Sequence, residues 1–384
     1  MKEKFSNLSW TTPGIFIFTM HALALLGLPF YFYLAPPSGS LIIISIFWLF
    51  ATELGVTSAY HRLYSHRSYK MAKFPESIFL FLATLTIQGS ALSWSHDHRF
   101  HHQFTDKEGD PYNVKKGLLH AHILWLFEKR QPIDQKIVPD LMENRLLVFQ
   151  DRHFVFLTTL GNILVVLATS WIVGDWLGAL VMAFGVRLLF SYHITWFINS
   201  LAHYWGEQSY SKECSARNNA ILAFLTHGEG YHSYHHAFPA DYRNGWRWYQ
   251  FDPNKWIIWM MSKIGLAKDL RRHNYNTITN RLIYMDRQRL LDIVQNMDLS
   301  KIRQALQRHG LAIQNNNIEI IINHYYQSLR TLGRDISKTI KEYRSIPKQN
   351  KDARQSLSQK LKELRQAYRE NWQKWLVLCK VIAS

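Results

Sequence analysis

The chain has 384 residues, two cysteines and a formal charge of +17, and its mean hydropathy of −0.18 conceals apolar runs in the first two hundred residues and a polar last hundred. Cys214 and Cys379 are too few for a disulfide framework, so we expect reduced thiols in an intracellular compartment. The basic excess favours anionic partners. Because the chain also contains apolar runs, we rank lipid headgroups or a phosphate-bearing substrate above nucleic acid, for which there is no motif.

Four apolar runs are each long enough to cross a bilayer, which takes about 20 helical residues. We predict spans at 13–34, 41–60, 154–173 and 177–198, with turns at 35–40 and 174–176. This pattern predicts an all-α integral membrane protein with two helical hairpins. The short N-terminus of mixed charge leads into the first run without a recognisable cleavage site, and we interpret that run as a retained anchor.

The distribution of lysine and arginine predicts the orientation of the spans. Lys2 and Lys4 precede the first span, neither hairpin turn contains a lysine or arginine, and the segment between the hairpins contains many. We therefore expect both termini and the segment between the hairpins to be cytoplasmic.

Two other segments complete the expected organisation. The apolar stretch 77–92 is rather short for a span, so we expect it to be buried or to lie along the interface; a fifth span is the alternative. From 274 onward the pattern is that of charged, amphipathic helices. We divide the chain into a membrane domain, 1–273, and a helical cytoplasmic extension, 274–384, whose charges we interpret as a solvated face.

Three histidine clusters have spacings that suit metal ligation: H-x4-H at 61–66 and H-x-x-H-H at 98–102 and at 232–236. Residues three and four apart share a helix face, so each triplet can present three imidazoles to one spot. His61 and His66 lie about 140° apart on an ideal helix, and they converge only if the helix unwinds or ends between them.

The fourth span ends with Asn199 and His203 on one helix face, and a polar pair at a membrane exit is a functional candidate. Together with the clusters, it brings the number of candidate ligands to nine imidazoles, enough for two ions, with Asn199 holding a bound water. The nine histidines are His61, His66, His98, His101, His102, His203, His232, His235 and His236.

Nearby residues can support these ligands. Carboxylates that accept the distal imidazole N–H orient a ligand; the candidates are Asp97, Asp106, Glu108, Asp110, Glu229 and Asp241, for each of which a turn or cap role is the alternative. His96, His120 and His227 lie near the clusters and could support them in the same way.

Imidazole suits iron, zinc and copper alike, so ligand type leaves the metal open. The clusters contain no cysteine, which excludes finger-type zinc, and no H-E-x-x-H motif occurs. Nitrogen-rich paired sites beside apolar helices favour oxygen chemistry on an apolar substrate. A metal transporter or a haem protein is disfavoured because the histidines gather at helix exits and not at mid-membrane or on facing spans.

The chain resembles the membrane-bound fatty acyl-CoA desaturases of the delta-9, stearoyl-CoA desaturase-like branch. The resemblance covers about residues 10–270 and rests on five stretches: GVT and HRLYSHR within 55–67, DHRFHH at 97–102, DPYN at 110–113, NSLAH at 199–203 and GEGYHSYHHAFP at 228–239. It implies a mushroom-shaped fold with four spans and a cytoplasmic cap that holds two iron ions (Fe²⁺/Fe³⁺). It also implies oxygen-dependent introduction of a cis, delta-9 double bond into a saturated acyl chain.

The resemblance also implies roles for individual residues. The nine histidines become metal ligands and catalytic residues, and Asn199 ligates through a water. Trp94 and Thr195 fall where the family bends its acyl tunnel, although Trp94 could be plain core. The phosphates of the acyl carrier could be faced by Arg99, Asn113, Lys129 and Arg130, for which an ordinary positive-inside role is the alternative.

No haem-binding His-Pro-Gly-Gly motif occurs, so we expect electrons from a separate carrier, such as a ferredoxin or a small cytochrome. The resemblance does not explain the extension after about 274, which we hypothesise docks that carrier. The substrate could be carried by coenzyme A, acyl carrier protein or an intact lipid. Hydroxylation of a lipid or alkane is the competing enzyme class, and its product would be an alcohol.

Overall fold

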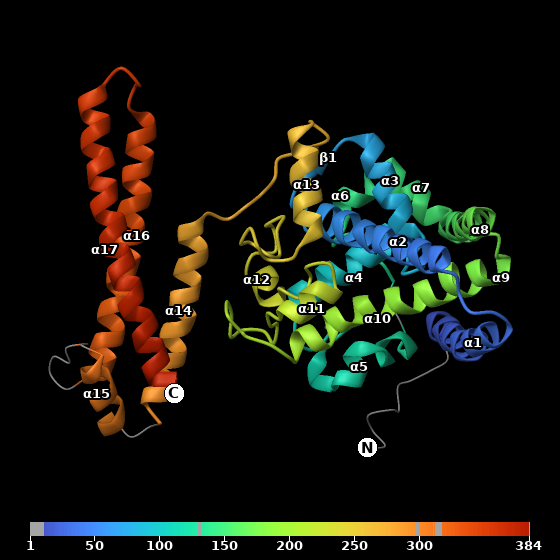
Figure 1. Ribbon diagram of the computed structural model, residues 1–384, viewed down its shortest axis with the longest axis horizontal. Helices are drawn as coiled ribbons and strands as arrows, with labels where there is room; N and C mark the ends of the chain where they lie inside the picture. Colours follow the sequence, from blue (N-terminus) through green and yellow to red (C-terminus); the bar gives the residue numbers. More distant parts are fainter. Residues whose placement is uncertain (1–10, 130–131, 297–298, 310, 312–316, 384) are drawn as a thin grey trace. The chain divides into compact units, whose positions relative to one another are not determined.

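The computed structural model describes residues 11–129, 132–296, 299–309, 311 and 317–383. The chain folds into two compact units, Met1–Arg272 and His273–Ser384 (Figure 1). The predictions that concern Lys2, Lys4 and Arg130 lie outside the described residues.

Four helical runs of the first unit are long and apolar enough to cross a membrane: Thr12–Leu34, Gly39–Ser65, Phe154–Val173 and Trp176–His203. They comprise α1 (Thr12–Leu34), α2 (Gly39–Gly55) with the π-helical η2 (Val56–Ser65), α8 (Phe154–Val173), and the series α9 (Trp176–Gly178), η5 (Ala179–Val186), α10 (Arg187–Asn199) and η6 (Leu201–His203). The predicted helical membrane fold with four spans is thus confirmed. The second and fourth runs continue past their predicted ends and carry His61 and His203 with them.

The turns between these helices have clear local causes. Ser38 caps α2 by accepting the N–H of Leu41, and Gly174 ends α8 in the left-handed region, at φ 76°. Asp175 accepts the N–H of Gly178 and also the hydroxyl of Tyr31, at 2.6 Å. The turn of the second hairpin is therefore tied to the first span.

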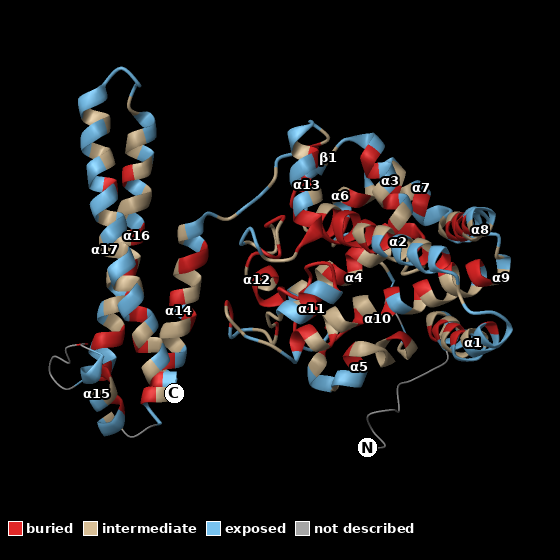
Figure 2. Ribbon diagram, viewed as in Figure 1, coloured by how far each residue is buried: buried red, intermediate tan, exposed pale blue. Residues whose placement is uncertain are grey.

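The outward faces of the four runs are apolar and exposed. At most 39% of the most apolar window of any run is buried within the protein, and side chains such as Leu25, Leu26 and Trp171 are more than 70% exposed. Figure 2 shows the same contrast, with exposed residues along α1 and α8 and buried ones around α4 and α12. Such a surface is stable against lipid and not against water.

The segment between the hairpins folds into β1 (Lys70–Met71), α3 (Lys73–Thr84), α4 (Ala91–Phe104), η3 (Val114–Lys116), α5 (Leu118–His122), η4 (Leu124–Phe127), α6 (Pro139–Met142) and α7 (Arg145–Arg152). The stretch predicted at 77–92 is therefore two elements. Its chain turns at Ile87 and Gly89, both with positive φ, and Ser90 then caps α4. With only 12 residues, α3 is too short to be a fifth span.

After the fourth span come α11 (Ala220–Leu225), α12 (His232–Ala237), α13 (Pro253–Lys263) and β2 (Ala267–Lys268), which pairs antiparallel with β1. A buried arginine joins this part to η2. The Arg62 guanidinium lies 3.0 Å from both Glu229 and Asp252 and donates to the carbonyl of Tyr242. Two carboxylates and a carbonyl pair with the terminal nitrogens of this buried cation, which makes the pairing of the two segments specific.

The second unit contains α14 (Tyr275–Val294), α15 (Leu299–Arg308), α16 (Ile318–Ser345) and α17 (Lys351–Ala383). Its core is apolar and includes Leu290, Leu306, Ile322, Leu329 and Trp375, none more than 2% exposed. The second unit thus has an apolar core of its own.

The packing of α2 on α3 yields the first prediction. A Cβ on Gly55 would lie 2.6 Å from the backbone nitrogen of Ala83 and 2.8 Å from the Cβ of Leu82. We expect Gly55→Ala to force the helices apart and to lower stability by about 1–3 kcal/mol, seen as a lower Tm in detergent. Gly27→Ala is the control, because a Cβ there meets nothing within 4 Å. Equal Tm values for the two variants would contradict this reading of the contact.

Candidate metal centre

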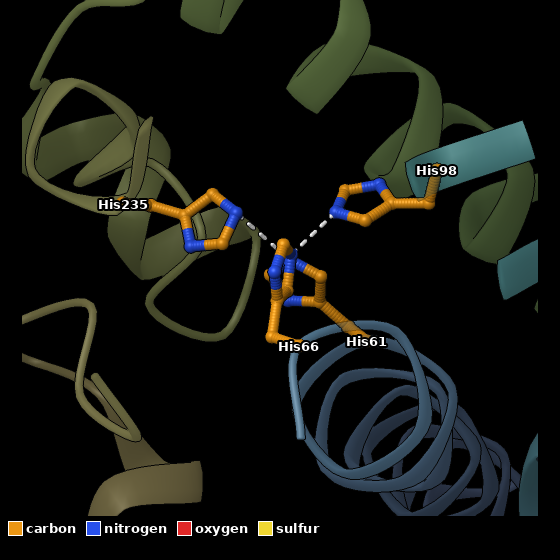
Figure 3. A group of neighbouring side chains, drawn as sticks. All are labelled: His61, His66, His98 and His235. Carbon is orange, nitrogen blue, oxygen red and sulfur yellow. Dashed lines mark hydrogen bonds between the residues drawn. The ribbon is translucent and has the colours of Figure 1, made fainter. Parts of the chain in front are cut away.

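The nine predicted histidines converge from four separate parts of the first unit. Their imidazoles form two groups in which the ligand nitrogens all lie within 4.8 Å of one another: His61, His66, His98 and His235 in the first, and His101, His203, His232 and His236 in the second. His102 lies between the groups, with its Nε2 3.0 Å from that of His235 and its ring stacked 4.3 Å from that of His236. Figure 3 shows the four rings of the first group pointing toward a common centre.

A π-helix brings the first pair together. Residues 56–65 form π-helical turns, and the N–H of His66 donates to the carbonyl of His61, five residues earlier, at 3.1 Å. In a π-helix each N–H bonds to the carbonyl five residues earlier, so the side chains of His61 and His66 lie on the same side of the helix. The two rings lie 4.8 Å apart. The helix therefore widens where the sequence led us to expect unwinding or an end.

Our expectation that each H-x-x-H-H triplet serves one spot is wrong. In α4, His98 belongs to the first group and His101 to the second; in α12, His235 belongs to the first, and His232 and His236 to the second. The reason is geometric: the two groups lie side by side between the helices, so neighbouring positions on each helix face reach different groups. Each triplet connects the two centres.

The spacing of the nitrogens fits metal ligation. Within the first group the Nε2 atoms of His66 and His98 are 2.8 Å apart, and those of His61 and His235 are 3.1 Å apart. In the second group, the Nε2 of His232 lies 3.0 Å from the Nε2 atoms of both His203 and His236. Two ligands at right angles, each about 2.1 Å from an ion, are about 3 Å apart. The side chains present therefore fit two metal ions.

The electrostatic environment disfavours protonation of six of these rings. Burial, reinforced by repulsion from neighbouring imidazoles, lowers the pKa of each of six rings: His66, His98, His102, His232, His235 and His236. The neutral imidazole is the form that binds metal. An ion would then supply positive charge that these six rings do not hold as protons.

Polar partners behind the rings orient several ligands. The Nδ1 of His101 lies 2.8 Å from a carboxylate oxygen of Asp110, and the Nδ1 of His61 lies 3.0 Å from one of Glu229. The Nδ1 of His203 lies 2.8 Å from the hydroxyl of Ser215, which donates to Asp106 at 2.7 Å. When Nδ1 carries the proton outward, the Nε2 lone pair faces the centre.

Two of these acids stay ionised despite burial. Burial alone would raise the pKa of Asp110, but the hydrogen bond and charge of His101 and two backbone N–H groups lower it. The charges and hydrogen bonds of His61 and Arg62 likewise overcome burial and lower the pKa of Glu229. Both groups therefore act as acceptors.

The other candidate supports lie elsewhere. Asp97 pairs with His96 at 3.0 Å, and Asp241 accepts the hydroxyl of Tyr234. Glu108 is exposed. His120 lies 3.6 Å from Glu128, and the ring of His227 packs on that of Phe50. Sequence reasoning missed Ser215, because a serine in a loop carries no spacing signal.

An apolar cavity of about 500 Å³ ends at the histidines. Most of its wall is hydrophobic, including Phe16, Ile87, Leu126, Tyr192 and Trp196, and it reaches Trp94, His98, Thr195 and Asn199. A smaller cavity of about 30 Å³ shares these last four residues and adds His61 and Glu229. A water needs roughly 10–15 Å³ of such space, so the smaller cavity can hold one beside Asn199.

Trp94 and Thr195 line both cavities, at the place where they meet. The ring of Trp94 is stacked on that of His98, at 5.0 Å and 21°. The hydroxyl of Thr195 accepts a hydrogen bond from the Gln88 side-chain amide at 3.0 Å, and Gln88 sits in the turn before α4. Gln88 is a cavity residue that sequence reasoning missed, because no motif marks the turn.

The four residues suggested for the acyl carrier lie in different surroundings. Lys129 lines a second recess of about 710 Å³, which also contains Lys116 and shares Asp97 and Trp125 with the apolar cavity. The guanidinium of Arg99 binds Asp140 and backbone carbonyls, and the side chain of Asn113 caps η3. Arg130 is outside the described residues.

Comparison with known proteins gives a consistent result. A model of the fatty acid desaturase family matches residues 35–263. The probable acyl-CoA desaturase of Schizosaccharomyces pombe is 40% identical over 281 residues, which cover 71% of this chain and 58% of that protein. Acyl-CoA desaturase 1 of Saccharomyces cerevisiae is 38% identical over 250 residues, which cover 64% of this chain and 49% of that protein.

The sn-2 palmitoyl-lipid 9-desaturase of Nostoc sp. is 33% identical over 260 residues, which cover 66% of this chain and 87% of that protein. The chain thus spans most of the Nostoc protein but only about half of the first two relatives. The family match contains all nine candidate histidines. With four apolar spans, paired histidine groups and a match over more than half its length, this chain belongs to the fatty acid desaturase family.

Proposed function

We propose that this protein is an oxygen-dependent fatty acyl desaturase that introduces a cis double bond, at the delta-9 position, into a saturated chain. The observation that carries the proposal is the apolar cavity that ends at His98, where the two histidine groups lie. The overall reaction converts –CH2–CH2– to –CH=CH– and reduces one dioxygen to two waters, with two electrons and two protons supplied from outside.

The names of the relatives support the substrate class. They describe desaturases of acyl-CoA and of a palmitoyl lipid. All of these names include a fatty acyl chain. We therefore propose an acyl chain as the substrate, carried either as a thioester or in a lipid.

The proposed cofactor is a pair of iron ions. The nine histidines would hold them, with His102 between the two groups, and Asn199 would act through a water in the small cavity. Bound iron would supply the activation of dioxygen that protein side chains cannot. The carboxylates of Asp110 and Glu229 would keep the imidazoles in the ligating tautomer.

Selectivity would come from placement. An acyl chain has no polar group near its middle that the protein could bind. The apolar wall must therefore set how deep the chain enters the cavity, while its polar head stays outside. The recess beside the cavity, with Lys116 and Lys129, is a candidate for that head. Water is excluded by the aromatic wall, which protects the oxidising centre from side reactions.

We further propose that both termini and the metal centre face the cytoplasm, as the distribution of lysine and arginine indicates. The electron donor would be a separate protein, a ferredoxin or a small cytochrome, that reaches the centre from that side.

The direct test is expression in a desaturase-deficient host, followed by mass spectrometry that locates new double bonds. We expect monounsaturated acyl chains with the bond at the ninth carbon. An alcohol product that retains an oxygen atom would instead establish the hydroxylase alternative.

The ligand assignment predicts the effect of removing one histidine from each group. We expect His101→Ala and His235→Ala to lower the bound iron and to abolish desaturation, since each leaves a centre without a ligand. Iron content per folded protein and product yield are the measurements. His324→Ala, at an exposed position of α16, is the matched control. Full activity of either group variant would remove that residue from the essential ligands.

The carboxylate of Asp110 orients the His101 ring, so changing it should weaken metal binding without abolishing it. Asp110→Asn replaces the ionised acceptor of the His101 N–H with a neutral amide, so metal affinity should fall about 10- to 100-fold. Titration of the metal-depleted protein with Fe²⁺ would measure this loss. Asp134→Asn, which removes a charge from an exposed turn that lines the same recess as Asp110, should bind iron as the wild type does. Unchanged affinity of Asp110→Asn would show that this carboxylate does not tune the ligand.

The junction of the two cavities predicts a change in selectivity. If Trp94 and Thr195 set the bend of the acyl chain, Trp94→Phe and Thr195→Ala should alter the position of the double bond or the rate more than the yield of folded protein. The ratio of positional isomers measures this independently of enzyme amount. A parallel loss of activity and folded protein, at an unchanged ratio, would assign both residues to the core.

A further inference from the structure

The second unit contains a recess that the desaturase family does not explain, since it lies beyond the matched residues 35–263. Its volume is about 610 Å³, and it is lined by the start of α14, the C-terminal half of α16 and the middle of α17. These three helices pack against one another within the unit (Figure 1). The recess is therefore a property of this unit alone.

Four cations line the recess, and no acidic residue is among its lining side chains. Lys341 and Arg344 come from α16, and Arg365 and Arg369 from α17. Their spacings of three and four residues place each pair on one helix face. None of the four has an ion pair or side-chain hydrogen bond with the described residues, whereas Arg287, outside the recess, donates to Asn323. The recess thus gathers positive charge that the fold itself does not neutralise.

Flat aromatic and apolar groups form part of the remaining wall, together with the uncharged polar side chains of Asn274, Asn276, Thr279, Ser337 and Gln373. The rings of Tyr368 and Trp372 lie 6.1 Å apart with planes 13° from parallel, and both side chains are half-buried. Ile336 and Ile340 of α16 also line the recess. A lining that combines unneutralised cations with an aromatic wall suits a ligand that has both anionic groups and a planar ring.

The floor of the recess depends on a close approach of helices. A Cβ on Gly333 of α16 would lie 2.4 Å from the side-chain oxygen of Asn276 in α14. Glycine at this position therefore lets α14 pack against α16 where both line the recess.

We propose that this recess binds a nucleotide, with its base against Tyr368 and Trp372 and its phosphates against the four cations. Charge alone would suit a solvated face, as the sequence led us to expect, or a planar anionic membrane. A concave pocket with an aromatic wall favours a discrete small ligand over both. The ligand would be a free nucleoside diphosphate or the equivalent part of coenzyme A; the second source rests on the proposed function.

Equilibrium binding to the full-length protein in detergent tests this proposal, with ADP, coenzyme A and pyrophosphate as separate probes. We expect saturable binding of ADP. The variant Arg344→Gln/Arg365→Gln should weaken it by about tenfold or more, because two charge-assisted contacts with phosphate are lost. The matched control, Arg334→Gln/Lys362→Gln, removes the same charge from the same two helices outside the recess and should bind as the wild type does.

A second variant tests the aromatic wall. Trp372→Leu should weaken ADP binding about fivefold or more and leave pyrophosphate binding unchanged, since only a base can stack on the ring. His101→Ala should lose desaturation but still bind ADP with wild-type affinity. A failure of the nucleotide proposal can thus be distinguished from a failure of the proposed function. Coenzyme A that binds more tightly than ADP would identify the carrier as the source.

Three outcomes would overturn the proposal. One is the absence of saturable ADP and coenzyme A binding at millimolar concentration. Another is equal affinity for ADP in the recess double variant and its matched control. The third is recognition of negative charge alone. Either pyrophosphate binding as tight as ADP binding or displacement of ADP by vesicles of anionic lipid alone would show it.

Discussion

Nine imidazoles must direct their nitrogens to two neighbouring points inside a buried volume, and the first unit is organised around that requirement. Burial and mutual repulsion lower the pKa of six of these rings, which favours the neutral, metal-binding form of those six. Imidazole nitrogens that lie about 3 Å apart need rigid support, because small displacements of the side chains would break the ligand geometry. The buried carboxylates of Glu229 and Asp110 provide part of this support.

The same contacts connect the metal centre to the membrane part of the protein. The π-helical end of the second span carries His61 beside Arg62, and that arginine reaches Glu229 and Asp252 in the segment of α12 and α13. Glu229 thus contacts both a candidate ligand and the cation that joins two distant segments. The apolar cavity ends at this junction, so under the proposed function the acyl chain would reach the histidine groups beside these buried ion pairs.

The second unit is built around an apolar core and not around the histidine groups. It has its own apolar core and lies outside the family match, so its sequence is free of the constraints that the metal centre imposes. Its unneutralised cations gather in a recess with an aromatic wall, a pattern that favours recognition of a ligand over mere solubility.

The sequence by itself determined the four spans, the nine histidines and the helical extension, because apolar length and histidine spacing are local properties of the chain. Only the tertiary structure decided how the histidines divide into two groups, since each H-x-x-H-H triplet faces both. It also decided that η2 is a π-helix, that Ser215 and Gln88 belong to the site, and that four cations share one recess. Apart from η2, whose hydrogen bonds join residues five apart, each of these depends on contacts between separate segments of the chain, and no periodicity along a single segment encodes such contacts.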